Sequence, residues 1–227
     1  MLGLFGPDAR RRSLLRKAPA GALRDYLSVP FPSRRSDWRE VPFVALDLET
    51  TGGDPERDEI VSFGWVCIDR ESIVLSSARH RVLRLRGEMS PTSAVIHSIT
   101  DDESAAGAPL EAVLSEFLGV LAGRVMVAHY TPTEVGFVAA ASRQVFGAEI
   151  LTPAVDTLTL ATAAARREHR RPARGELRLG NLRRRYGLPR YPAHNALSDA
   201  LSAAELFLAL AAERRGPIDL GMLMSPK

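Results

Sequence analysis

The chain has 227 residues, enough for one domain with additions or for two small domains. Hydrophobic residues make up 45% and charged residues 25%, a balance that excludes wholesale disorder and fibrous repeats. No stretch approaches the ~18 consecutive apolar residues of a transmembrane helix. The N-terminus lacks the order of a signal peptide, so we expect a cytoplasmic protein with no membrane partner. The single cysteine, Cys67, excludes an intrachain disulfide and a cysteine-based zinc cluster.

The net charge of +3 is unevenly distributed along the chain. Residues 1–40 carry a net charge of +5 and residues 166–190 a net charge of +8, so the remainder sums to −10. All but two of the 30 basic residues are arginines, whose guanidinium groups match phosphate oxygens. Genome base composition is the simpler explanation of that bias. The distribution suits a site of gathered carboxylates beside polyanion-binding segments, and an ordinary solvated surface also accounts for it.

The first forty residues are predicted to form a basic N-terminal extension. A short helix is expected over 9–27, followed by a linker that contains Pro30 and Pro32. The main domain is expected at 41–215, with residues 216–227 as a C-terminal tail.

Strands are predicted first in the main domain, over 43–48, 60–68 and 73–85. A polar turn at 69–72 joins the last two, which indicates an antiparallel three-stranded meander. Strand–helix alternation follows, with strands at 124–128 and 154–156 and helices at 109–121, 132–146, 157–168, 177–186 and 196–215. This order predicts an α/β protein with a mixed sheet.

Two carboxylates interrupt the apolar end of the first predicted strand. Asp47 and Glu49 are two residues apart, so their side chains share one face of the strand. Such a pair is unfavourable without a compensating cation, and Mg²⁺ and Mn²⁺ prefer oxygen ligands. Two solvated acids at a strand end fit this short pattern at least as well.

Three further polar residues flank predicted helices. His194 lies just before the last helix and Asp199 lies within it. A histidine at a helix start can act as a base near neutral pH, although a solvated capping pair fits as well. Glu134 is predicted in the first turn of the 132–146 helix, where it either reaches the same cleft or simply favours the helix dipole.

Together, and in this order, these segments resemble the DEDDh (DnaQ-like) exonuclease family over residues 41–215. The family's first motif, Asp-x-Glu followed by Thr-x-Gly, is matched by residues 47–52, and its third, His-x4-Asp, by His194 and Asp199. Residues 95–100 and 155–158 are similar to two further family stretches. The family's second motif is His-Asn-x-x-Phe-Asp, and the corresponding stretch of this chain differs from it and reads His129-Tyr-Thr-Pro-Thr-Glu134. Glu134 keeps the charge of the usual aspartate and adds one methylene. Tyr130 and Thr133 replace the asparagine and the phenylalanine, and the family's phenylalanine is the residue expected against the terminal base.

The resemblance implies a ribonuclease H-like fold, with a mixed sheet flanked by helices. It also implies 3′–5′ hydrolysis of single-stranded DNA by two divalent ions, Mg²⁺ or Mn²⁺. The implied metal ligands and catalytic carboxylates are Asp47, Glu49, Glu134 and Asp199, the implied general base is His194, and the implied substrate contacts are Thr50, Thr51, Gly52 and Phe137. The two threonines would offer backbone N–H groups to the terminal nucleotide, whereas Phe137 also suits the core. A polymerase or another replication or repair protein is an expected partner.

Three other functions stay open at this point. An exoribonuclease of the same fold differs only in how the site treats a 2′-hydroxyl. A non-catalytic nucleic-acid-binding module is favoured by Glu134 and disfavoured by His194. A phosphatase with an aspartyl nucleophile would need a partner lysine that the sequence does not offer. The arginine-rich segment at 166–190 suits either phosphate contacts or a solvated loop.

Overall fold

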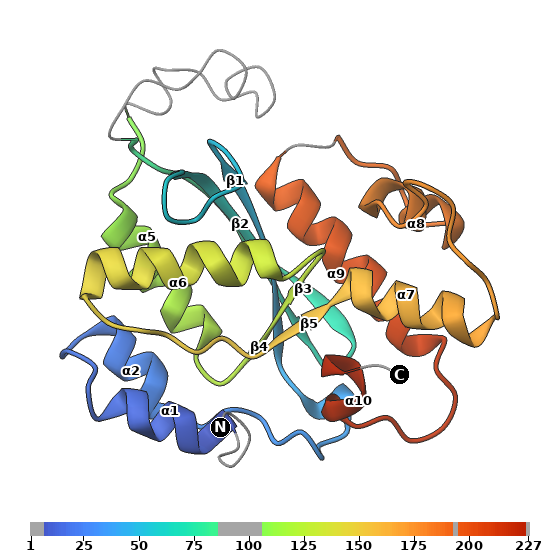
Figure 1. Ribbon diagram of the computed structural model, residues 1–227, viewed down its shortest axis with the longest axis horizontal. Coiled ribbons are helices and arrows are strands. Elements are labelled where there is room, and N and C mark those ends of the chain that lie inside the picture. The colour runs from blue at the N-terminus through green and yellow to red at the C-terminus, as the bar shows by residue number, and fades with distance from the viewer. Residues whose placement is uncertain (1–6, 86–105, 193–194, 226–227) are drawn as a thin grey trace.

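A computed structural model describes residues 7–85, 106–192 and 195–225, which contain a five-stranded mixed sheet (Figure 1). The strands are β1 (Phe43–Thr50), β2 (Ile60–Asp69), β3 (Ser72–Val82), β4 (Val125–Ala128) and β5 (Ala154–Asp156), in the order β3-β2-β1-β4-β5. β2 pairs antiparallel with β1 and β3, and β4 pairs parallel with β1 and β5. The predicted meander with two added parallel strands is confirmed.

β1 is buried on both of its faces. Val44, Leu46 and Leu48 pack into one hydrophobic cluster, whereas Phe43 and Ala45 pack into a second cluster on the opposite face. This alternation follows from the two-residue period of a strand. The apolar run that predicted the strand is therefore a central strand between two helical layers.

The helices cover both faces of the sheet. The first cluster packs α1 (Pro7–Leu15), α2 (Ala22–Ser28), α5 (Leu110–Leu121) and α6 (Pro132–Phe146), which lie to the left in Figure 1. The second packs α7 (Thr157–Arg167), α8 (Leu179–Arg185), α9 (Ala196–Ala212) and the short α10 (Leu220–Met224). No helix in the described ranges is long and apolar enough to cross a membrane.

The prediction of one helix over 9–27 was wrong, because α1 and α2 are separate helices. Pro19 disfavours helical geometry in the residue before it, and Gly21 has a φ of 110°, which a helix does not contain. α2 packs against α5, where Leu23 and Leu27 are fully buried. Later in the N-terminal segment, Trp38 packs edge-on against Phe207 of α9 at a ring distance of 5.8 Å. The division at residues 40 and 215 stays a prediction.

Candidate active site

Three carboxylates converge where β1 passes under α9. Asp47 and Glu49 continue the row of Phe43 and Ala45, so they lie on the α9 face of the sheet. Asp199, in the first turn of α9, completes the group, and one ligand oxygen from each of the three residues lies within 4.8 Å of the others. The shared face of Asp47 and Glu49 and the approach of Asp199 agree with the sequence prediction.

A glycine on β2 allows α9 to come this close. Gly64 is the antiparallel partner of Asp47, and a Cβ atom built on Gly64 would lie 2.0 Å from the carbonyl carbon of Ala196. Any side chain at this position would therefore push the start of α9 away from the sheet. The helix begins there because the Asn195 side chain accepts a hydrogen bond from the Ser198 N–H at 3.1 Å. Sequence reasoning missed Gly64, although a glycine inside an apolar strand often marks a close backbone approach.

Glu134 lies in the first turn of α6 and is only 4% exposed. Its Oε2 atom has no hydrogen-bond partner in the described part of the chain. Burial, with a smaller contribution from the charge of Asp156, raises the pKa of Glu134 to about 8. The carboxyl group of Glu134 contributes to the raised pKa of Asp47, but Glu134 is not one of the three residues whose oxygens converge within 4.8 Å.

Asp47 is the centre of this cluster of acidic side chains. Burial raises its pKa well above the usual range, and the charges of Glu134, Asp199 and Glu49 raise it further. Three carboxylates whose oxygens converge in this way match the donor set of a hard divalent cation, and the Oε2 atom of Glu134, without a hydrogen-bond partner in the described residues, is a further candidate ligand. The residues present therefore fit a metal site.

Two threonines at the end of β1 form hydrogen bonds within the loop that follows the strand. The Thr50 hydroxyl donates to the Gly52 carbonyl at 2.7 Å, and the Thr51 N–H donates to the Glu59 carbonyl at 2.9 Å. In this structure the Thr51 N–H therefore already has an acceptor. A Cβ atom on Gly52 would lie 2.5 Å from the Asp58 carboxylate, so any side chain there would displace that carboxylate. Contacts of Thr50, Thr51 and Gly52 with a substrate stay predictions.

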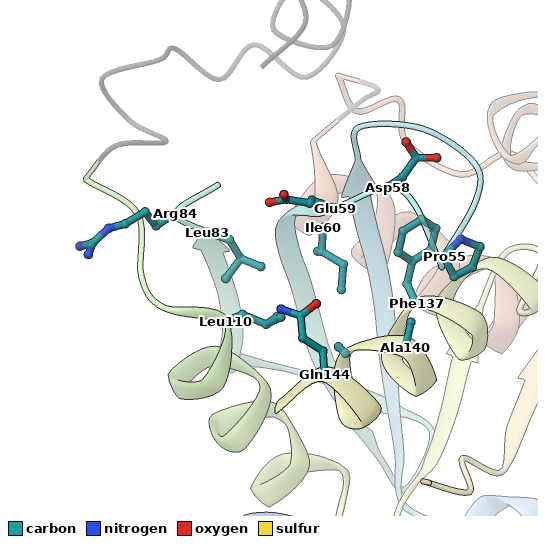
Figure 2. Close-up of a pocket in the computed structure, with 11 residues that line it drawn as sticks. Pro55, Asp58, Glu59, Ile60, Leu83, Arg84, Leu110, Phe137, Ala140 and Gln144 are labelled. Carbon is teal, nitrogen blue, oxygen red and sulfur yellow. The ribbon is translucent and has the colours of Figure 1, made fainter. Parts of the chain in front are cut away.

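Phe137 points into the core on the α6 side of the sheet. It is 2% exposed and lines a small pocket of about 70 Å³ with Pro55 and Ile60 (Figure 2). The lining of that pocket does not include Asp47 or Asp199, which line a separate and larger cleft. The location fits the core alternative given for Phe137, and its contact with a substrate stays a prediction.

The larger cleft joins the carboxylates to the arginine-rich segment. It has a volume of about 640 Å³ and is lined by Asp47 and Asp199 together with Arg178, Arg184 and Arg190. Other arginines of the segment are paired with acids, because Arg170 and Arg185 both contact Glu168 and Glu176. The segment therefore has an ion-paired part and a part that faces the cleft.

His129, which sequence reasoning left without a role, holds this segment in place. Its Nδ1 atom lies 2.8 Å from the Thr157 hydroxyl and its Nε2 atom 3.0 Å from the Leu177 carbonyl. Burial lowers the pKa of His129, so the ring is neutral at pH 7 and bridges β4, α7 and the arginine-rich segment. His194 and residues 95–100 lie outside the described residues, so the predictions on them stand untested.

Comparison with known proteins agrees with this geometry. The exonuclease family model matches residues 44–207. A PolC-type DNA polymerase III of Thermotoga petrophila is 33% identical over 173 residues, which are 76% of this chain and 12% of the relative. The DNA polymerase III subunit epsilon of Treponema pallidum is 32% identical over 184 residues, 78% of this chain and 81% of that relative. The chain thus spans a small part of the PolC-type proteins and most of an epsilon subunit.

Solved structures of exonuclease I share the fold. One superposes with a TM-score of 0.66 at 17% identity, over 76% of this chain and 41% of that chain. The zinc-bound complex of E. coli exonuclease I with single-stranded DNA superposes with a TM-score of 0.65 at 16% identity, over 77% and 41%. The expected ribonuclease H-like fold is confirmed. Since the family model covers most of the chain, and the chain is 32% identical to an epsilon subunit over 81% of that relative, this chain belongs to the exonuclease family of nucleases.

Proposed function

We propose that this protein is a metal-dependent exonuclease that removes nucleotides from the 3′ end of single-stranded DNA. The observation that carries the proposal is the convergence of Asp47, Glu49 and Asp199 within 4.8 Å beside the buried Glu134. The cleft lined by Asp47 and Asp199 has basic walls, which suit a polyanion. The names of the epsilon-subunit relatives and of the single-stranded DNA complex of exonuclease I support the substrate class.

The carboxylates have the role of metal ligands in this proposal. Asp47, Glu49 and Asp199 would hold one divalent cation, Mg²⁺ or Mn²⁺, and Asp47 and Glu134 would contribute to a second. When bound, such ions lower the pKa of a water molecule and stabilise negative charge on the phosphodiester oxygens. Glu134 is buried, and Asp47 is half-buried at the wall of the cleft.

His194 is proposed as the general base that takes the proton from the attacking water. An unperturbed imidazole titrates near pH 6.5, which suits proton transfer near neutral pH. In the sequence His194 precedes Asn195, the cap of α9, and the same helix carries Asp199. His194→Gln should therefore abolish the acidic limb of the pH–rate profile as well as lower the rate.

The arginines of the cleft are proposed to hold the strand by its phosphates. Arg178, Arg184 and Arg190 are exposed along the cleft that contains Asp47. Phosphate contacts carry no sequence information and weaken as salt rises. We expect degradation that is insensitive to base sequence and inhibited by salt.

The test uses oligonucleotides labelled at either end. In Mg²⁺ or Mn²⁺, 5′-labelled single-stranded DNA should shorten stepwise and 3′-labelled DNA should release its label at once, and a chelator should stop both. Asp47→Asn should reduce the rate by at least about 100-fold, since it removes a ligand worth several kcal/mol in the transition state. Glu111→Gln, an exposed acid in the first turn of α5, is the matched control and should keep the wild-type rate.

Two results would overturn the proposal. One is the absence of metal-dependent 3′ shortening of any DNA, with binding retained, as a non-catalytic module would behave. The other is full activity in Asp47→Asn. RNA of the same sequence belongs in the same experiment, and faster shortening of RNA would reassign the substrate to the exoribonuclease class.

A further inference from the structure

An apolar groove adjoins the carboxylate cleft and has no part in the chemistry described above. It has a volume of about 580 Å³, and its walls are Tyr130, Leu158, Pro172, Leu177 and Leu179. The groove and the cleft share His129, Arg178 and Leu179 as lining residues, so they lie next to each other. We call this surface the Tyr130 groove.

Tyr130 is unusual in both its side chain and its backbone. Its side chain is one of few large apolar groups exposed in the described residues, at 51%. Its φ is 78°, in the left-handed region that bulky residues seldom occupy. The Asp156 carboxylate stabilises this conformation by accepting the Tyr130 N–H at 2.9 Å. Strained positions that persist are concentrated at functional sites, and here the strain presents an aromatic ring to solvent.

Positive charge lies along the rim of the groove. Arg178 is exposed at the junction with the cleft, and no ion pair is recorded for it within the described ranges. Arg171 and Arg174 are also exposed, and in the sequence they adjoin the lining residues Pro172 and Ala173. An apolar wall with an exposed ring and a cationic rim matches a nucleobase and its phosphate, because bases stack on aromatic rings and guanidinium groups bind phosphate.

We propose that the Tyr130 groove binds one unpaired base of the strand whose 3′ end lies in the carboxylate cleft. The base stacks on Tyr130, and Arg178 contacts the phosphate beside it. The occupant is a single-stranded nucleic acid because a base inside a duplex has no free face to offer the ring. This inference rests on the proposed function and adds an upstream contact to it.

The first experiment compares two substitutions of Tyr130 in the full chain. Tyr130→Asn removes the ring while asparagine tolerates the left-handed backbone, and Tyr130→Phe keeps the ring. Binding of a 5′-fluorescent DNA octamer is measured by anisotropy in Ca²⁺. Tyr130→Asn should raise Kd by about 5- to 100-fold, the effect of losing one base–aromatic stack. Tyr130→Phe should stay within about twofold of wild type. Leu75→Asn, which removes an exposed apolar group on β3, is the control and should not change Kd.

The second experiment locates the base. A series of octamers carries one abasic nucleotide at successive positions from the 3′ end. For the wild-type protein, an abasic nucleotide at one internal position should lower affinity as much as the Tyr130→Asn substitution does. For the Tyr130→Asn variant, an abasic nucleotide at that same position should lower affinity no further. Arg178→Gln should weaken binding of every octamer and reduce its salt dependence, whereas Arg35→Gln, far along the chain and exposed, should change neither.

The outcomes separate the two proposals. If wild type shortens DNA from the 3′ end while Tyr130→Asn binds every abasic octamer as wild type does, the groove assignment is overturned and the proposed function stands. If wild type neither binds nor shortens any oligonucleotide, the proposed function itself fails.

Discussion

At the scale of single residues, Glu134 has a carboxyl group that the fold keeps away from water. In the metal-free protein burial raises its pKa to about 8, against 4.5 for an ordinary glutamate. The folded state therefore binds this proton more tightly than the unfolded state does. Stability consequently falls as pH rises from about 4.5 to about 8, the window between the two pKa values.

Glu134→Gln should remove this pH dependence. In chelator at pH 8 the variant should be more stable than wild type by on the order of a few kcal/mol, and the difference should nearly vanish at pH 5. Thermal denaturation at both pH values measures this, with Glu111→Gln as the control. An equal difference in Tm at pH 5 and pH 8 would contradict the raised pKa. Added Mg²⁺ should reverse the order at pH 8, because the variant lacks the charged ligand.

At the scale of elements, the close contact of α9 with β2 brings Asp199 to Asp47. The contact depends on Gly64, since a Cβ there would lie 2.0 Å from the backbone of Ala196. Gly64→Ala should therefore displace the start of α9, cost about 1–3 kcal/mol or more through overpacking, and lower the exonuclease rate by at least about tenfold. Gly119→Ala is the matched control, because nothing lies within 4 Å of its Cβ and alanine favours the helix. Wild-type turnover by Gly64→Ala would show that the carboxylates tolerate a shift of α9.

Arg183 joins α8 to α9 and to the segment that precedes α9. It is 4% exposed, pairs with Glu205 at 2.6 Å, donates to the Ser202 and Pro189 carbonyls, and lies over the Tyr191 ring at 4.8 Å. Arg183→Met leaves Glu205 without its cation and should cost about 3–5 kcal/mol.

The double variant Arg183→Met/Glu205→Met should be less destabilised than the single one, because the unpaired charge is then gone. Urea denaturation of both variants measures this coupling. Arg185→Met, which breaks exposed ion pairs only, should cost about 1 kcal/mol or less. If Arg183→Met and Arg185→Met lower the free energy of unfolding equally, the ion pair of Arg183 with Glu205 does not stabilise the fold more than the exposed ion pairs do.

The parts of the site that sequence predicted are those set by local periodicity. Asp47 and Glu49 share a face because strand residues alternate, and Glu134 follows a strand end where a helix begins. The role of Gly64 depends on a helix more than 130 residues later, and the hydrogen bond of His129 with Leu177 joins elements that no local pattern connects. Pro19 and Gly21 indicate the break between α1 and α2, but the helix-favouring composition of the residues around them led to the prediction of one helix.

At the scale of the whole molecule, the N-terminal helices are part of the hydrophobic core on the α6 side of the sheet. Leu23, Tyr26 and Leu27 are at most 1% exposed, and the Tyr26 hydroxyl donates to the Leu151 carbonyl at 2.8 Å. Arg11 of α1 is buried as well, and it donates to the Leu27 carbonyl. Burying each large apolar side chain contributes about 1.5–3 kcal/mol. The entropy lost in ordering these helices offsets part of this gain, but a loss of a few kcal/mol is already a large fraction of the 5–15 kcal/mol stability of a typical domain.

Removal of residues 1–30 should consequently leave a chain that is largely unfolded or aggregated at 37 °C, rather than a folded nuclease that has lost only a flexible arm. Leu27→Ala tests the same contact more gently and should cost about 2–5 kcal/mol in urea denaturation. Val29→Ala, two residues on and 37% exposed, should cost about 1 kcal/mol or less. A truncated chain that melts cooperatively within a few degrees of wild type and still shortens DNA would mean that the extension only decorates an independent domain. A melted truncation together with a normal Val29→Ala would mean that the positively charged N-terminus and the acidic body fold as one unit, because the apolar residues of α2 complete the core under α5.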